Sequence, residues 1–242
     1  MRKFGLIGKS LTHSFSKKYF TQKFEQQQLI NCVYKNFELA TIESLKALLT
    51  ENPNIEGLNV TIPYKETIVK SMDWLSADAK SIGAVNCVKI ANGKLIGFNT
   101  DALGFETALQ QLIGNLKPFC FILGTGGSSK AVVHILKKNN LPYILVSRQF
   151  KEGQTTYSSI AQHLTPANLF INTTPLGMFP DINNCPDIPY HLLSEKDFLF
   201  DLTYNPAESL FLKKGKEQHC KTMNGQLMLE VQAEESWKIW NS

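Results

Sequence analysis

Two patterns of apolar positions alternate along the first part of the chain. Apolar runs at residues 3–7, 32–39 and 56–62 predict buried strands. Between them, segments 14–28 and 42–49 repeat their apolar residues at the spacing of a helix face. Strands that alternate with helices are typical of a parallel sheet covered on both faces.

A turn signal interrupts this alternation at Asn92-Gly93, which lies between apolar segments 84–90 and 94–98. An Asn-Gly pair is favoured in the two-residue turn of a β-hairpin, because both positions need a positive φ. We therefore expect an antiparallel hairpin, which makes the first sheet mixed.

A second alternating series follows a helix predicted at 101–113. The sequence Gly124-Thr125-Gly126-Gly127 separates an apolar strand from an amphipathic helix, and a last helix is predicted at 225–240. The strands predicted in this half, with helical segments between them, are 119–123, 143–147, 169–172 and 198–201.

Composition narrows the class of protein. The chain has 242 residues, 43% hydrophobic and 19% charged, which is ordinary for a globular protein. Its net charge of +4 is not clustered, so nucleic acid is not an expected partner. The five cysteines show no metal-ligand spacing, and neither a signal-peptide core nor a membrane-length apolar run occurs. We expect a cytoplasmic protein without a metal site.

The glycine turn is suited to a dinucleotide. Gly124 permits a sharp turn, Gly126 lets the backbone approach a phosphate, and the helix after it supplies unpaired N–H groups. Ser129 stands where the common fingerprint has its third glycine. A strand-to-helix turn without a ligand remains the alternative.

The residues after strand 143–147 indicate which dinucleotide. Ser147, Arg148 and Lys151 occupy this strand end, where NAD-binding chains usually place an acidic residue for the ribose diol. Basic groups suit the 2′-phosphate of NADP instead. NADP is therefore favoured over NAD, and a solvated loop remains the alternative for Arg148 and Lys151.

An ammonium and a carboxylate on tight loops could exchange a proton with a small polar molecule. Lys65 follows a strand end that carries Asn59 and Thr61, Asn86 lies in a short loop, and Asp101 begins a helix. Neutral amides and hydroxyls of this kind bind the hydroxyl groups of a ligand. Most lysines are only surface groups, so the case for Lys65 depends on these neighbours.

Eight ordered stretches resemble the shikimate dehydrogenase family over almost the whole chain. They are HSFS (13–16), GLNVTIPYKE (57–66), GAVN (83–86), FNTDALGF (98–105), LGTGGSSKA (123–131), INTTPLGM (171–178), DLTYNP (201–206) and GQLMLEVQAEESWKIW (225–240).

The resemblance implies an α/β fold. It consists of an N-terminal α/β substrate domain with a mixed sheet and a C-terminal Rossmann-type NADP-binding domain, with a cleft between them. The substrate domain is expected at 1–101, completed by the C-terminal helix at 225–242, and the cofactor domain at 102–224.

The resemblance also implies a role for individual residues. Lys65 and Asp101 would form the catalytic pair. The implied substrate ligands are Ser14, Ser16, Thr61, Asn86, Tyr204 and Gln232, to which the residue pattern adds Asn59. The implied cofactor ligands are Gly124, Thr125, Gly126, Gly127 and Ser128 for the phosphates, Arg148 for the 2′-phosphate, and Thr173, Leu202 and Gly225 near the nicotinamide.

Simpler roles remain open for several of these residues. Ser14 and Ser16 could cap a helix, Tyr204 could be a packing aromatic, and Gln232 could be a polar surface group. The short stretch between Arg148 and residue 169 could reduce the loop on the adenine side.

The expected activity is the reversible NADP-dependent reduction of 3-dehydroshikimate to shikimate, by a monomer or a homodimer. Two alternatives stay open. One is a quinate or dual quinate/shikimate dehydrogenase that uses NAD, and the other is a non-catalytic NADP-binding regulatory module.

Overall fold

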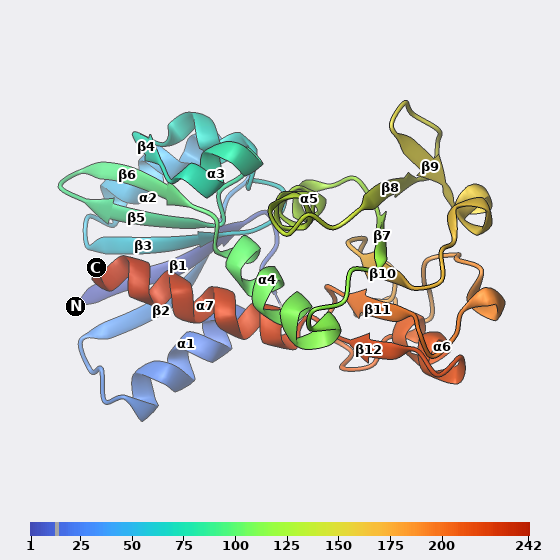
Figure 1. Cartoon of the computed structure of the whole chain (residues 1–242). Helices are drawn as coiled ribbons and strands as arrows, with labels where there is room; N and C mark the ends of the chain where they lie inside the picture. The colour runs from blue at the N-terminus through green and yellow to red at the C-terminus, as the bar shows by residue number, and fades with distance from the viewer. Residues whose placement is uncertain (13–14) are drawn as a thin grey trace. The chain divides into compact units, whose positions relative to one another are not determined.

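The computed structural model describes residues 1–12 and 15–242, and it divides into two compact α/β units. Unit 1 comprises residues 1–100 and 233–242, and unit 2 comprises residues 101–232. Each unit is built around its own six-stranded sheet (Figure 1). The substrate and cofactor roles expected for residues 1–101 with 225–242 and for residues 102–224 stay predictions.

The sheet of unit 1 is mixed, as the hairpin signal predicts. Its strand order is β2-β1-β3-β5-β6-β4, with antiparallel pairs β3–β5 and β5–β6 and parallel pairs elsewhere. The strands are β1 (Arg2–Gly8), β2 (Cys32–Glu38), β3 (Ile55–Val60), β4 (Trp74–Leu75), β5 (Cys87–Ala91) and β6 (Lys94–Phe98).

Helices cover both faces of this sheet. Successive side chains of a buried strand point to opposite faces, so both faces present apolar side chains that must be covered. Phe4 of β1 packs on one face against α1 (Phe15–Gln26) and α7 (Gln226–Asn241), which lie side by side in Figure 1. Ile7 of the same strand belongs to the core on the other face. That face is covered by η1 (Ile42–Ser44), α2 (Leu45–Glu51), η2 (Thr67–Ser71) and α3 (Ala77–Ile82).

The predicted hairpin is confirmed. Asn92 and Gly93 have φ values of 53° and 73°, and they join β5 to β6 in antiparallel register. β5 begins at Cys87, three positions later than the apolar run at 84–90 predicts. The reason is that the backbone N–H of Val85 donates to the carbonyl of Lys65 in a loop rather than to a strand.

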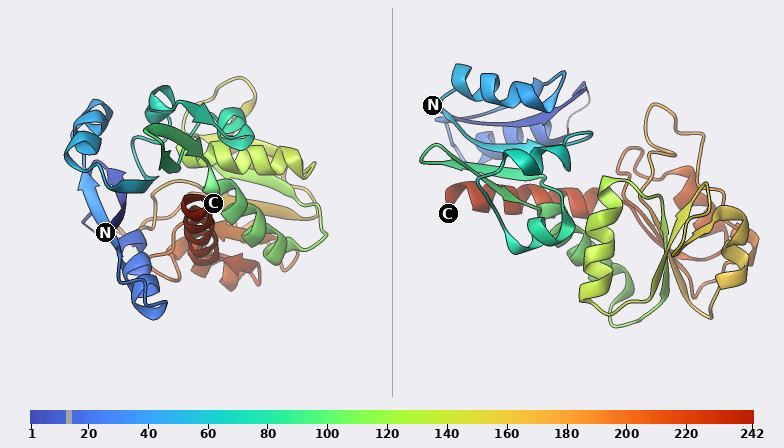
Figure 2. Two further views of the ribbon diagram at one scale, coloured as in Figure 1. Left: turned by 90° about the vertical axis from the view of Figure 1, so that its left-hand side faces the viewer. Right: turned by 90° about the horizontal axis from the view of Figure 1, so that it is seen from above.

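The sheet of unit 2 is entirely parallel, in the order β12-β11-β10-β7-β8-β9. Figure 2 shows α5 on one face of this sheet and α6 on the other. The strands are β7 (Phe119–Leu123), β8 (Tyr143–Ser147), β9 (Gln154–Thr156), β10 (Asn168–Asn172), β11 (Phe198–Asp201) and β12 (Lys221–Met223). The α-helices are α4 (Thr100–Ile113), α5 (Gly127–Lys138) and α6 (Leu210–Glu217).

This strand order reverses direction at β7, whose two neighbours are β8 and β10. In a doubly wound sheet, ligands bind outside the carboxyl ends of the strands at such a reversal. The α/β class and the Rossmann-type fold expected for the second half of the chain are confirmed.

The helical segments expected between the later strands are present, but they are short 3-10 helices. They are η3 (Tyr157–His163), which follows β9, and η4 (Tyr190–Leu192), which follows β10. Between β8 and β10 the chain forms the short strand β9 and then η3, in place of a single α-helix. The edge strands β9 and β12 are too short and polar for the apolar pattern to indicate them.

Candidate active site

Two loops of unit 1 bring the predicted substrate residues together at one end of the sheet. The first loop follows β3 and carries Thr61 and Lys65, and the second precedes β5 and carries Asn86. The backbone N–H of Val85 donates to the carbonyl of Lys65 at 2.7 Å, and that of Val60 donates to the carbonyl of Asn86 at 2.8 Å. The two loops are therefore joined through their main chains.

Lys65 is half-buried on this first loop, and the residue before it anchors the loop to the protein interior. The neighbouring Tyr64 is buried, and its hydroxyl donates to the carbonyl of Leu39 at 2.5 Å. Because Tyr64 is anchored, the backbone position of the neighbouring Lys65 is restricted. A group that reacts with a substrate must be positioned in this way.

Asn59 and Asn86 are both buried and belong to one hydrogen-bond network. Oδ1 of Asn59 accepts from Tyr34, and Nδ2 of Asn59 donates to Oγ of Ser236 at 2.9 Å. Ser236 lies 3.3 Å from Oγ1 of Thr100, and Nδ2 of Asn86 donates to that same Thr100 oxygen at 3.0 Å. The network thus joins β3, the start of α4 and α7.

Ser16 also belongs to this network, because its side chain is hydrogen-bonded to Tyr34. It is 8% exposed in α1. Ser14, the other serine predicted to bind substrate, lies outside the described residues.

Asp101 occupies the first turn of α4 and is 9% exposed. The N-terminus of a helix carries a partial positive charge, and acidic side chains are favoured in the first turn for that reason. Asp101 belongs to unit 2 and Lys65 to unit 1, and their pairing stays a prediction.

The glycine turn of unit 2 has the geometry that phosphate binding requires. Gly124 has a φ of +105°, and a side chain there would lie 2.9 Å from Oγ1 of Thr173. Gly126 precedes α5, and a Cβ at Gly126 would meet nothing within 4 Å. The backbone around Gly126 is therefore open in front of a helix N-terminus, and the turn fits a dinucleotide pyrophosphate.

Basic side chains lie after β8, as the sequence predicts. Arg148 and Lys151 are exposed, and no carboxylate in residues 1–12 or 15–242 forms an ion pair with either. Burial raises the pKa of the nearby Tyr157, and the charge of Arg148 acts in the opposite direction. Ser147 donates its hydroxyl to the carbonyl of Gln149, which fixes the start of this loop.

A buried carboxylate, Asp201, organises the loop that contains Thr173. Oδ1 of Asp201 accepts from Nδ2 of Asn172 at 3.0 Å and from the backbone N–H of Thr203 at 2.9 Å, and Oδ2 accepts from Ser209. Oδ1 of Asn172 in turn accepts from the backbone N–H of Thr174 at 3.0 Å. Burial raises the pKa of Asp201, and these hydrogen bonds act against that rise.

The remaining predicted residues of unit 2 follow β11 or belong to α7. A side chain at Gly225 would lie 2.1 Å from the carbonyl oxygen of Leu202, so only glycine fits between them. Burial raises the pKa of the half-buried Tyr204. Gln232 is buried, and its Nε2 donates to the carbonyl of Leu229 at 3.0 Å.

The structure adds residues that the sequence did not single out, namely Tyr34, Thr100, Asn172, Asp201 and Ser236. One signal could have identified Asp201, because it is a charged residue at the end of an apolar strand that opens a polar motif. No local pattern marks Tyr34 or Ser236.

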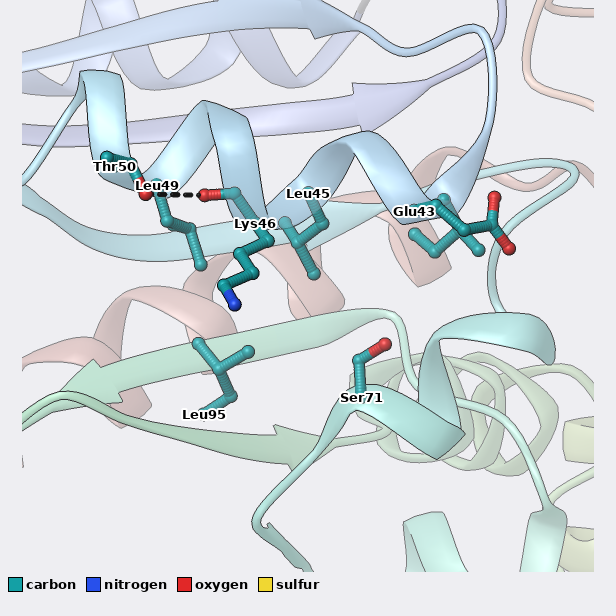
Figure 3. A pocket seen from close by; sticks show the side chains of 8 residues that line it. Glu43, Leu45, Lys46, Leu49, Thr50, Ser71 and Leu95 are labelled. Atoms are coloured by element: carbon teal, nitrogen blue, oxygen red, sulfur yellow. Dashed lines mark hydrogen bonds between the residues drawn. The ribbon is translucent and has the colours of Figure 1, made fainter.

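A separate cavity of about 490 Å³ lies between α2 and β6 of unit 1 (Figure 3). Its walls are mainly apolar, with Leu45 and Leu49 of α2 facing Leu95 of β6 across it. None of the predicted site residues lines it, so it is not the candidate active site.

Among the residues that the structure describes, no group of three or more His, Cys, Asp and Glu side chains could hold a metal ion. None of the helices within residues 1–12 and 15–242 has the length and apolar character that a membrane crossing requires.

Residues 6–88 match the family described as the shikimate dehydrogenase substrate binding domain. The chain is 37% identical to a shikimate dehydrogenase (NADP(+)) of Methanococcus aeolicus over 254 residues, which cover 98% of this chain and 90% of that protein. It is 35% identical to the enzyme of that name from Clostridium perfringens, covering 100% and 93%.

Solved structures give the same result. A shikimate dehydrogenase in complex with NADP+ superposes with a TM-score of 0.88 at 34% identity, covering 99% of this chain and 90% of that one. The Thermus thermophilus shikimate 5-dehydrogenase in complex with NADP(H) and shikimate superposes with a TM-score of 0.84 at 29% identity, covering 99% and 93%.

Proposed function

The chain belongs to the shikimate dehydrogenase family, and we propose that it interconverts shikimate and 3-dehydroshikimate with NADP as its cofactor. The protein is thus an oxidoreductase that acts on a CH–OH group. The observation that carries this conclusion is the match to NADP-dependent shikimate dehydrogenases along 98% of the chain.

Unit 2 supplies residues suited to hold the cofactor, at the carboxyl edge of its sheet. We assign the phosphates to residues 124–128 and the 2′-phosphate to Ser147, Arg148 and Lys151. The nicotinamide is assigned to Thr173, Leu202 and Gly225. The open backbone at Gly126 and the exposed charges of Arg148 and Lys151 support these assignments. Bound NADP supplies the hydride acceptor and, when reduced, the hydride donor.

Lys65 and Asp101 are proposed to exchange a proton with the reacting oxygen of the substrate. During shikimate oxidation the hydroxyl that becomes a carbonyl must lose its proton, and the reverse reaction must return one. An amine and a carboxylate can share this proton at the substrate oxygen. The anchored loop of Lys65 and the position of Asp101 in the first turn of α4 support these roles.

The other predicted ligands are proposed to bind the ring hydroxyls and the carboxylate of the substrate. Hydroxyl and amide groups suit this task, because they donate and accept hydrogen bonds without adding a net charge. These residues are Ser14, Ser16, Asn59, Thr61, Asn86, Tyr204 and Gln232.

We further propose that the protein acts in the cytoplasm as a monomer or a homodimer, without nucleic acid as a partner. The unclustered net charge of +4 and five free cysteines support this proposal.

Initial rates test the proposed function. Purified protein is assayed for oxidation of shikimate and of quinate, each with NADP+ and with NAD+. Shikimate with NADP+ should give the highest kcat/KM. Preference for quinate with NAD+ would identify the alternative dehydrogenase, and no turnover with any pair would indicate the non-catalytic module.

A further inference from the structure

Backbone groups determine which way the two buried amides of unit 1 point. The backbone N–H of Thr100 lies 2.6 Å from Oδ1 of Asn86, and an N–H can only donate. The carbonyl of Asn86 lies 3.5 Å from Nδ2 of Asn59, and a carbonyl can only accept. Neither amide can therefore be turned over without losing a bond to the main chain.

Tyr34 satisfies the oxygen of Asn59. Its hydroxyl donates to Oδ1 of Asn59 at 2.8 Å, and the Tyr34 side chain is almost completely buried. Burial raises the pKa of Tyr34 well above its usual range, so the phenol keeps the proton that it donates. Ser16 contacts the same hydroxyl.

Ser236 satisfies the nitrogen of Asn59 and connects it to Asn86. It is completely buried in α7, accepts from Nδ2 of Asn59 at 2.9 Å, and lies 3.3 Å from Oγ1 of Thr100. Thr100 in turn contacts Asn86 through both its hydroxyl and its backbone N–H. The amide of Asn59 thus has internal partners on both its oxygen and its nitrogen.

We propose that Tyr34 and Ser236 are positioning residues of the substrate site, which act through Asn59 and Thr100 on the orientation of Asn86. The inference rests on the proposed function, in which Asn86 binds shikimate. The same network also holds the amide of Asn59, so the substrate-binding role proposed for Asn59 depends on it as well.

The physical reason is that a buried polar atom without a partner costs free energy, which the site reduces by rearranging. Without the Ser236 hydroxyl, Nδ2 of Asn59 keeps only the long 3.5 Å contact to the Asn86 carbonyl. The hydroxyl of Thr100 loses its contact with the Ser236 hydroxyl at the same time. Asn86 would then sample orientations that bind substrate less well.

The test compares Ser236→Ala, Tyr34→Phe and the double variant with the wild-type protein in steady-state kinetics. Each single change should raise KM for shikimate about tenfold and leave kcat and KM for NADP+ near their wild-type values. Both changes act on the same amide, so the double variant should be less impaired than the product of the two single effects.

A matched control is Tyr190→Phe, which removes a tyrosine hydroxyl that donates to the carbonyl of Pro186 outside this network. It should lower thermal stability without changing KM for shikimate. Tyr34→Phe removes a single oxygen atom, so it keeps the test open if Ser236→Ala does not fold. Ser236→Cys, which retains a weak hydrogen-bonding group of similar size, should recover part of the affinity.

The outcomes separate the two proposals. A wild-type protein that does not oxidise shikimate would overturn the proposed function and this inference with it. An active wild-type protein whose Ser236→Ala and Tyr34→Phe variants keep their KM for shikimate would overturn the inference alone. Fully additive effects would show that Tyr34 and Ser236 act independently, and equal rises in KM for shikimate and for NADP+ would show general destabilisation. Either result would also overturn the inference.

Discussion

The backbone N–H of Thr100 donates a hydrogen bond of 2.6 Å to Oδ1 of Asn86, so a loop residue caps the first turn of α4. The first N–H groups of a helix have no partner within the helix, and a side-chain oxygen can satisfy them. Asp101 is the next residue. Asn86 therefore supports the position of Asp101 through the main chain, in addition to its proposed contact with substrate.

Replacement of Asn86 by alanine should affect both stability and binding. Loss of the cap should lower the free energy of unfolding by about 1 to 2 kcal/mol, and KM for shikimate should rise. Urea denaturation and initial rates measure the two effects. Asn183→Ala, at an exposed position of unit 2, is the control. Unchanged stability of Asn86→Ala would contradict the capping role.

Lys65→Ala should reduce kcat for shikimate oxidation by a factor on the order of 100 to 10,000, because the reaction would lose a general acid–base group. KM for shikimate should change much less. Lys70→Ala in η2 removes an exposed lysine nearby in the chain and should retain wild-type kinetics. A near-normal kcat for Lys65→Ala would remove this residue from its proposed role.

The two glycines of the turn should differ in what they tolerate. Gly126→Ala should keep wild-type thermal stability, because the φ of Gly126 is −83° and no atom lies within 4 Å of the position of an added Cβ. The same variant should raise KM for NADP+, because the added methyl group would obstruct the phosphates. Gly124→Ala should lose about 1 to 2 kcal/mol of stability as well, because its φ is positive. Equal melting temperatures for the two variants would disprove this distinction.

Arg148→Ala should raise KM for NADP+ about tenfold and leave KM for NAD+ nearly unchanged, because only NADP carries the 2′-phosphate. Parallel titrations of the two cofactors at fixed ionic strength measure the ratio. Lys213→Ala in α6 removes an exposed charge of the same unit and is the control. If both KM values rise equally, Arg148 does not recognise the 2′-phosphate.

The raised pKa of Asp201 predicts a specific pH dependence of stability. A carboxyl whose pKa is higher in the folded than in the unfolded state binds a proton on folding. Its contribution to stability is present below the unfolded pKa and is lost as pH rises through the folded pKa.

Asp201→Asn mimics the protonated side chain: its Oδ1 can still accept from Asn172 and Thr203, and its Nδ2 can donate to the Ser209 hydroxyl, from which the wild-type carboxylate accepts. Melting temperatures of this variant and of the wild type are compared between about pH 8 and about pH 5. The wild type should gain stability relative to the variant as pH falls. A constant difference would mean that the carboxyl titrates alike in both states.

Much of the architecture could be predicted from local pattern. β7, β8 and β11 have the predicted bounds, because each is a short apolar run between turn residues. The hairpin at Asn92-Gly93 and the turn at Gly124 follow from backbone conformations that few other residues adopt. Local steric and hydrophobic preferences are sufficient for such features.

Tertiary structure alone decided the network around the buried amides. Asn59 and Ser236 are 177 positions apart, and Thr100 and Ser236 are 136 apart, yet each pair is in hydrogen-bond contact. A hydroxyl on a helix has the same local preferences whether it faces water or a buried amide, so no nearby residue reveals its partner. The need to pair every polar group that the packed sheet and helices remove from water selects those partners.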